Sequence, residues 1–323
     1  MITMRNKKIK TFYTDKQVCF DSIREKSYSQ SPLKPALLMK KIMEGPHAEM
    51  LDVVNDFQPI AKEDYYIAHT QEYVNNVFNK TGNYASNSLP WSQNLVDSLP
   101  YTTGSLYAAS KHAIENPETV CFAPISGMHH ARPHGGSGFC TFSGQVVSAV
   151  KIYQETGMSC AYFDLDGHFG NSIEDTREFN PLLNKAIPEG CNINPVGYNA
   201  TYISDFKDSL RHVGQLILAG KIHYVVFAHG ADSHDDDDLG GQVGTEYWEM
   251  CAEVFAKWVN VISDKMGKPL PVVLALFGGY RKDDYDTVLN LHIKSLSHCS
   301  NIICGNDFNT DLPIAVKKQK SYY

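Results

Sequence analysis

The chain has 323 residues, of which 43% are hydrophobic and 20% are charged, and its formal net charge is −7. These proportions are those of an ordinary globular protein. The acidic balance argues against a nucleic-acid-binding protein, which normally presents a basic face. The eight cysteines contain no C-x-x-C pair. Because disulfide frameworks are typical of much shorter secreted chains, we expect reduced thiols.

The sequence carries no predicted targeting or membrane segment. Met1–Lys10 is basic, but the residues after it are mixed rather than the apolar core of a signal peptide. No apolar run approaches the roughly 20 residues that span a bilayer. No linker-like stretch divides the chain, and the acidic run Asp235–Asp238 is interpreted as a solvated loop. We therefore predict one domain over residues 1–323 of a soluble, cytoplasmic protein.

Short apolar runs alternate with longer helical patterns along the chain. In order, the predicted elements are a strand at Lys10–Tyr13, a helix at Thr103–Ile114, a strand at Thr119–Pro124, a helix at Gln145–Glu155, a strand at Cys160–Asp164, a helix at Ser204–Ala219, a strand at Tyr224–Ala228, a helix at Thr245–Met266, a strand at Val272–Phe277 and a helix at Asp283–Ser295. Residues 180–200, with three prolines and two glycines, are predicted to be a loop, and Gly267 a helix C-cap. This alternation predicts an α/β fold in which helices cover both faces of a mainly parallel sheet.

Three of the predicted strands run directly into side chains that bind metals or transfer protons. The strand at 160–164 leads to Asp166 and His168, and the strand at 224–228 leads to Asp232. The strand at 119–124 is followed by His129 and His130. Ligands of open α/β sheets bind outside the carboxyl ends of the strands, so these segments could converge on one pocket. Two carboxylates and an imidazole, with two further histidines nearby, suggest a metal site that activates water.

The ligand spacing supports this interpretation. Asp166 and His168 stand two residues apart, so in an extended chain both side chains project to one side. Asp232 would complete three protein ligands and leave one position open for water. Taken alone, a D-x-H pair is more often a structural hydrogen-bonded pair. The second strand-end aspartate favours the metal site.

The tandem histidines lie in a glycine-rich turn, since Gly127 precedes them and three glycines follow between residues 135 and 138. Two imidazoles beside a metal-bound water can divide the acid–base work. A buried carboxylate such as Asp164 would raise the pKa of the imidazole that it contacts. Farther along, Tyr280 follows two glycines at a strand end, where its phenol could stabilise an oxyanion. The alternatives are two surface imidazoles and an incidental tyrosine.

Four motifs follow one another along the chain: Gly127–Ala131 followed by Gly138–Cys140, Asp164–Asn171, Gly230–Ser233 followed by Asp237–Gly240, and Leu276–Tyr280. In this order they resemble the motifs of the histone deacetylase superfamily and its acetylpolyamine amidohydrolase relatives. Weaker similarities at Ser31–Pro35 and His69–Tyr73 extend the resemblance over nearly the whole chain. The resemblance implies a single α/β domain with a mainly parallel sheet of the arginase/deacetylase type.

The resemblance also implies a metal centre. Zinc would be held by Asp166, His168 and Asp232, and this oxygen-rich ligand set does not by itself separate zinc from ferrous iron. Tyr280 would polarise the acetamide oxygen. A structural potassium ion would lie near Asp164, Asp166 and His168.

Two histidine pairs would carry the proton chemistry of such an enzyme. His130, paired with Asn171, would be the principal general base and then the acid toward the leaving amine. His129, paired with Asp164, would act mainly electrostatically. Some members have aspartate where this chain has Asn171, and an amide partner should leave His130 less basic.

Gly138 and Phe139 would line a narrow tunnel for an acyl-lysine or polyamine chain. The implied reaction is removal of an acetyl or other acyl group from lysine in a protein or peptide, with an acetylated polyamine as the alternative substrate. The loop Gly82–Trp91 has no clear acidic residue where protein deacetylases often grip the substrate backbone, which argues against a peptide. The stretch Gly230–Gly241 looks closer to the lysine deacylases, and we favour that branch.

Two further classes are weighed against the deacylase. Arginase-like ureohydrolases share the fold but bind two manganese ions through D-x-H-x-D and D-x-D motifs. Gly170 and His234 stand where those motifs need an aspartate, which argues against a binuclear site. A catalytically inactive module that binds acyl-lysine would keep the fold without turnover, so metal content and hydrolysis of any acetamide would separate it from an enzyme.

Overall fold

The structure, a computed structural model, describes residues 6–23, 29–84 and 87–317. Residues 1–5 of the basic N-terminal segment and residues 85–86 of the 82–91 loop therefore lie outside the described residues. Within the described part of the chain, seven strands form one sheet in the order β2-β1-β3-β7-β6-β4-β5. All of its strand pairs are parallel, which confirms the predicted α/β fold class.

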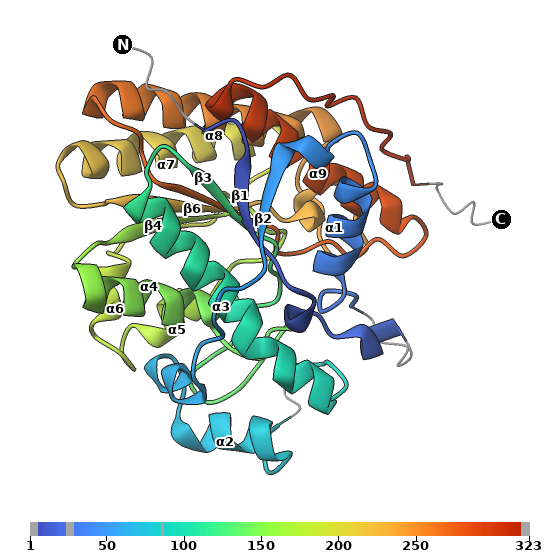
Figure 1. Cartoon of the computed structure of the whole chain (residues 1–323), viewed down its shortest axis with the longest axis vertical. Coiled ribbons are helices and arrows are strands. Elements are labelled where there is room, and N and C mark those ends of the chain that lie inside the picture. Colours follow the sequence, from blue (N-terminus) through green and yellow to red (C-terminus); the bar gives the residue numbers. More distant parts are fainter. Residues whose placement is uncertain (1–5, 24–28, 85–86, 318–323) are drawn as a thin grey trace.

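The strands are β1 (Ile9–Phe12), β2 (Leu51–Val54), β3 (Val120–Ala123), β4 (Cys160–Asp164), β5 (Asn192–Ile193), β6 (Tyr224–Ala228) and β7 (Val272–Ala275). The α-helices are α1 (Lys34–Met43), α2 (Gln71–Asn79), α3 (Gln93–Glu115), α4 (Gly144–Thr156), α5 (Ser172–Thr176), α6 (Leu183–Ala186), α7 (Ala200–Leu218), α8 (Thr245–Met266) and α9 (Tyr285–Cys304). The helices flank the sheet in two groups, with α8 between α7 and α9 on one face and α4 against α3, α5 and α6 on the other (Figure 1).

Helices on both faces explain why the central strands are apolar on both sides. Every residue of β3, β4, β6 and β7 is buried. Phe163 of β4 and Phe227 of β6 pack on Phe255 of α8, with ring centroids 5.7 Å and 4.1 Å apart. Burying one such side chain contributes about 1.5–3 kcal/mol. This two-sided packing holds the strand ends, and hence the site, in a fixed frame.

The predicted elements agree with the structure most closely around the centre of the sheet. β4, β6 and α8 have the predicted bounds, and α8 ends at Gly267 with φ 67°. The loop predicted for residues 180–200 is wrong in part, because α6 and the two-residue β5 lie there. β5 exists through its pairing with β4, which a two-residue sequence pattern cannot reveal.

Other differences concern helix ends and thiols. α3 begins at Gln93 rather than Thr103, because Ser92 caps it by accepting a 3.1 Å hydrogen bond from the Leu95 amide. All eight cysteines are buried free thiols, as expected for reduced residues. None of the helices in the described ranges is both long and apolar enough to cross a bilayer. The bounds predicted for the domain, residues 1 and 323, stay a prediction.

Candidate active site

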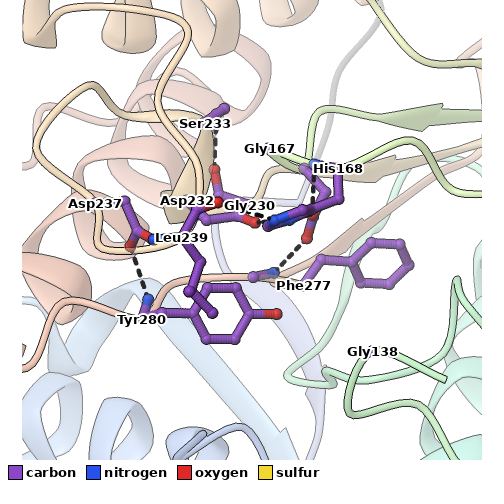
Figure 2. Close-up of polar contacts among 12 residues, drawn as sticks. Gly138, Gly167, His168, Gly230, Asp232, Ser233, Asp237, Leu239, Phe277 and Tyr280 are labelled. Atoms are coloured by element: carbon purple, nitrogen blue, oxygen red, sulfur yellow. Dashed lines mark hydrogen bonds and ion pairs between the residues drawn. The ribbon is translucent and has the colours of Figure 1, made fainter. Parts of the chain in front are cut away.

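The strand order places the predicted site residues at one edge of the sheet. Because β3, β7, β6 and β4 are neighbours and run parallel, their carboxyl ends meet at the same edge. The side chains of Asp166, His168 and Asp232 come together there, and one donor atom from each lies within 4.8 Å of the other two. Figure 2 shows His168 and Asp232 facing each other across the ends of β4 and β6.

The hydrogen bonds of His168 indicate that this cluster requires a cation. The Nε2 atom lies 3.0 Å from the Leu239 carbonyl oxygen, which can only accept, so Nε2 carries a proton. Nδ1 then faces two carboxylates, 2.9 Å from Asp232 Oδ2 and 3.2 Å from Asp166 Oδ1. Such an arrangement is stable only with positive charge between the groups, supplied by a proton on Nδ1 or by a metal ion.

A second observation on Asp232 agrees with a metal site. Its Oδ1 atom is buried and has no hydrogen-bond partner among the described residues. A buried carboxylate oxygen without a partner costs free energy, and a bound cation removes that cost. Carboxylate and imidazole ligands suit Zn²⁺ and Fe²⁺. The residues present therefore fit the metal that the sequence predicts.

Glycines leave the space that these carboxylates occupy. A Cβ atom on Gly278 would lie 2.3 Å from Asp232 Cγ, and one on Gly240 would collide with the Asp232 carbonyl oxygen. On the β4 side, a Cβ on Gly170 would overlap the carboxylate of Asp164. The Gly278 amide also donates a 2.7 Å hydrogen bond to Asp166 Oδ2. The glycine-rich turns thus bring backbone against the ligands on two sides.

The two histidine pairs form as the sequence predicts. His129 Nδ1 lies 2.9 Å from Asp164 Oδ2, and His130 Nδ1 lies 2.8 Å from Asn171 Oδ1. The two imidazole rings are 4.0 Å apart. Gly138 has its backbone against the His130 ring, since a Cβ there would lie 2.5 Å from the imidazole Cδ2.

The two imidazoles differ in charge because their surroundings differ. Burial lowers the pKa of His129, but Asp166 and Asp164 outweigh this effect and raise the pKa to about 9. Burial lowers the pKa of His130 to about 4, helped by the neighbouring His129. At neutral pH, His130 is therefore uncharged and can accept a proton, whereas His129 is charged.

The metal-ligand candidates are electrostatically coupled. Hydrogen bonds with Asp166 and Asp232 raise the pKa of His168 to about 11. Burial, followed by the charge of Asp166, raises the pKa of Asp232 to about 8. In the absence of a metal ion, the cluster therefore retains a proton at neutral pH that a divalent cation would displace.

Tyr280 lies beside this cluster (Figure 2). Its ring centroid is 6.2 Å from that of His168 and 5.5 Å from that of Phe139. Its side chain is 8% exposed. Burial, with the nearby Asp166, raises the pKa of the phenol well above its usual value, so the phenol stays protonated. Phe139 thus contacts the predicted oxyanion donor, while the tunnel itself stays a prediction.

The acidic run Asp235–Asp238 is more than the solvated loop that the sequence predicts. Asp235 is exposed, but Asp237 is buried and accepts hydrogen bonds from the amides of Tyr280 and Leu239, at 2.7 Å and 2.9 Å. The solvated-loop prediction is wrong for Asp237, because backbone donors replace its water. The run instead anchors Tyr280, and Lys317 pairs with Asp238 at 2.5 Å on its outer side.

Lys34 is a further part of the site whose contribution the sequence analysis does not identify. It is fully buried at the start of α1 and donates hydrogen bonds to the carbonyl oxygens of Phe277 and Gly278, the latter at 2.8 Å. Ser126 Oγ donates to the same Phe277 carbonyl at 3.0 Å. Burial lowers the pKa of Lys34 to about 8, against the opposing charges of Asp232 and Asp166. The ammonium group thus supports the turn that carries Gly278 and Tyr280.

Comparison with known proteins finds a matching family model and one relative. The family model of the histone deacetylase domain matches residues 28–183. An uncharacterized protein of Picosynechococcus sp. is 25% identical over 222 residues, which are 62% of this chain and 68% of that protein.

Two solved structures show the same fold at low sequence identity. The HD domain of HDA15 superposes with a TM-score of 0.68 at 15% identity, covering 93% of this chain and 89% of that chain. An acetylpolyamine aminohydrolase from Burkholderia pseudomallei gives a TM-score of 0.64 at 14% identity, covering 92% of this chain and 98% of that chain. The predicted arginase/deacetylase type of fold is thereby confirmed.

Proposed function

We propose that this chain, whose residues 28–183 match the family model of the histone deacetylase domain, is a metal-dependent amidohydrolase that removes an acetyl or other acyl group from the side-chain amine of lysine. The observation that carries this proposal is the cluster of Asp166, His168 and Asp232, in which the imidazole Nδ1 faces two buried carboxylates. We propose zinc as the metal and ferrous iron as the alternative. The structural potassium ion and the cytoplasmic location stay predictions.

A divalent cation bound by these three residues would lower the pKa of a water molecule and withdraw electron density from an amide carbonyl. The protein supplies the proton acceptor. His130 donates a hydrogen bond from Nδ1 to Asn171 Oδ1, which leaves the Nε2 lone pair free. In the proposed mechanism, Nε2 takes a proton from the attacking water and returns it to the leaving amine.

His129 and Tyr280 would stabilise the charge that develops on the substrate. His129 is charged through its contacts with Asp164 and Asp166, so it favours negative charge on the substrate without transferring a proton. The Tyr280 phenol keeps its proton and can donate a hydrogen bond to the carbonyl oxygen as it becomes an oxyanion. Removal of one such donor typically costs about 2.7–4 kcal/mol of transition-state stabilisation.

An acetylated polyamine is the second candidate substrate. The superposed aminohydrolase from Burkholderia pseudomallei acts on acetylpolyamines by name, and the other superposed structure is an HDA domain. The sequence of the Gly230–Gly241 stretch favours lysine for this chain. The acyl-lysine would belong to a protein or peptide.

The test is hydrolysis of a fluorogenic acetyl-lysine peptide beside N-acetylputrescine, by zinc-loaded protein with and without a chelator. We expect chelator-sensitive turnover of the peptide, with the higher kcat/KM for the peptide. Preference for N-acetylputrescine would move the protein to the polyamine branch. An absence of turnover of both substrates, with one metal ion bound per chain, would exclude the acetyl group as the substrate acyl group and leave a different acyl group or the inactive binding module.

A further inference from the structure

The side-chain amide of Asn171 is held at both of its ends. Its oxygen lies 2.8 Å from His130 Nδ1, and its nitrogen donates a 2.6 Å hydrogen bond to Asp175 Oδ2. Asn171 stands at the start of α5, and the Asp175 amide donates to the Asn171 carbonyl at 2.9 Å. This single helical turn places the carboxylate beside the amide group.

The orientation of this amide decides which nitrogen of His130 carries the proton. An amide oxygen can only accept a hydrogen bond, so its neighbour Nδ1 must be protonated and Nε2 keeps its lone pair. If the amide were turned over, its NH₂ group would face Nδ1. The imidazole would then carry its proton on Nε2, where it could not accept one from water.

Asp175 opposes that rotation. A carboxylate accepts hydrogen bonds and does not donate them, so only the NH₂ end of Asn171 can face it favourably. In the rotated state, two acceptor oxygens would stand at hydrogen-bonding distance without a proton between them. Arg132 also contacts this carboxylate, with its Nε 3.3 Å from Asp175 Oδ2.

We infer that Asp175 is a positioning residue that fixes the Nδ1-protonated tautomer of His130 through the amide of Asn171. The inference rests on the proposed role of His130 as the general base. The Asp175 carboxylate contacts Asn171 and Arg132 rather than the His130 imidazole or the metal-ligand candidates. It also assigns a function to the N-x-x-x-D spacing of Asn171 and Asp175. An amide has a donor end and an acceptor end that Asp175 can orient, whereas an aspartate at position 171 would present an acceptor in either orientation.

The first measurement is the ¹⁵N spectrum of His130 in the zinc-loaded protein, which distinguishes the two neutral tautomers without any turnover. We expect the Nδ1-protonated form in the natural protein and a mixture with the Nε2-protonated form in Asp175→Ala. Glu174→Ala is the matched control, because it removes the neighbouring carboxylate of α5, which pairs with Arg177 instead. An unchanged tautomer in Asp175→Ala would overturn the inference, whatever the activity of the enzyme.

Kinetics in two backgrounds provides the second measurement. We expect Asp175→Ala to lower kcat about tenfold with little change in KM, a fraction of the effect of a general base. In the Asn171→Asp background, the same substitution should leave kcat unchanged or raise it, because it removes a repelling carboxylate. An equal loss in both backgrounds, or an equal loss in Glu174→Ala, would mean a general structural role and would overturn the inference.

If all variants lack turnover, the proposed function fails but the tautomer measurement still decides the role of Asp175. If the natural protein is active and the tautomer does not respond, the inference fails while the proposed function stands. The two failures are therefore distinguishable.

Discussion

The two ends of the parallel strands, called here the carboxyl and amino edges of the sheet, carry glycines for different physical reasons. At the carboxyl edge, Gly278 and Gly170 lack the space for a side chain, because a Cβ would overlap the carboxylates of Asp232 and Asp164. At the amino edge, Gly157, Gly220 and Gly267 end α4, α7 and α8 with φ near 70°, and a Cβ there would meet nothing within 4 Å. Space requires glycine at the first two positions, and backbone conformation favours it at the other three.

Two phenylalanines at the carboxyl edge have an unfavourable backbone conformation. Phe139 and Phe277, both at the carboxyl edge, adopt φ of 64° and 62°, which glycine tolerates far better than phenylalanine. Each such residue costs on the order of 1–3 kcal/mol. At the amino edge, the same left-handed conformation is given to glycine and carries little strain. Phe139 and Phe277 thus place backbone strain beside the candidate active site, although Lys80, Ser88 and Asn199 also have positive φ elsewhere in the described residues.

The largest expected effect is that of Gly278→Ala. A Cβ within 2.3 Å of Asp232 must displace either the carboxylate or the turn that carries Tyr280. We expect loss of bound metal and a fall in kcat/KM of roughly 100-fold or more, as displacements near 1 Å produce. Metal content per chain and peptide hydrolysis are the measurements, with circular dichroism as the control for folding. Full metal binding and activity would show that the turn can shift to accommodate the methyl group without disturbing Asp232 or Tyr280.

Tyr280→Phe should have the next largest effect, because it removes one hydroxyl and leaves the packing of the ring. We expect kcat to fall roughly 100- to 1,000-fold while the protein still binds one metal ion. Single-turnover hydrolysis and metal analysis are the measurements. Full activity would exclude Tyr280 as the oxyanion donor.

Metal affinity should depend on pH through His168. Its pKa in the folded, metal-free protein is about 11, above the ordinary value of 6.5. The stability that this proton contributes is complete below pH 6.5 and is lost as the pH rises toward 11. A metal ion displaces the proton, so we expect zinc affinity to rise up to about tenfold per pH unit in this window.

Calorimetry in buffers of different ionisation enthalpy would measure the protons released on zinc binding at pH 7.5. We expect between one and two, because His168 and Asp232 both have a pKa above 7.5 in the metal-free protein. The melting temperature of the metal-free protein should also fall between pH 7 and pH 9. Zinc binding without proton release would contradict a protonated His168 in the metal-free cluster.

The smallest expected effect is at the amino edge. Gly157→Ala should lower the free energy of unfolding by about 1 kcal/mol, because alanine disfavours the left-handed conformation at the end of α4. Since the new methyl group meets no neighbour, kcat/KM and metal content should not change. Urea unfolding beside the peptide assay would check both expectations. A large loss of activity would contradict the expectation that glycines at the amino edge affect stability alone.

The sequence alone predicts the centre of the sheet and the residues that gather at its carboxyl edge. Apolar runs followed at once by Asp166, His168 and Asp232 carry that information locally, and parallel topology brings the ends together. The position of Lys34 could not be predicted in this way. A lysine is normally exposed, and this one is buried because it meets carbonyl groups of Phe277 and Gly278, which are distant in sequence.

Asp175 and Asp237 show two further limits of the sequence pattern. The spacing of Asn171 and Asp175 could have indicated a contact across one helical turn, but a five-residue helix gives too weak a pattern to predict. Asp237 lies among four acidic residues, whose composition indicates a solvated loop, and only the backbone amides around it explain its burial.

The position of β7 has a consequence for synthesis of the chain. β7 is the last of the described strands in sequence, yet it lies in the middle of the sheet between β3 and β6. A nascent chain that has not reached residue 275 therefore exposes two inner strand edges, on β3 and on β6, whose backbone groups lack their partner. Such edges readily pair with other chains. We therefore expect a chain that ends before β7 to aggregate more readily than a chain that contains it.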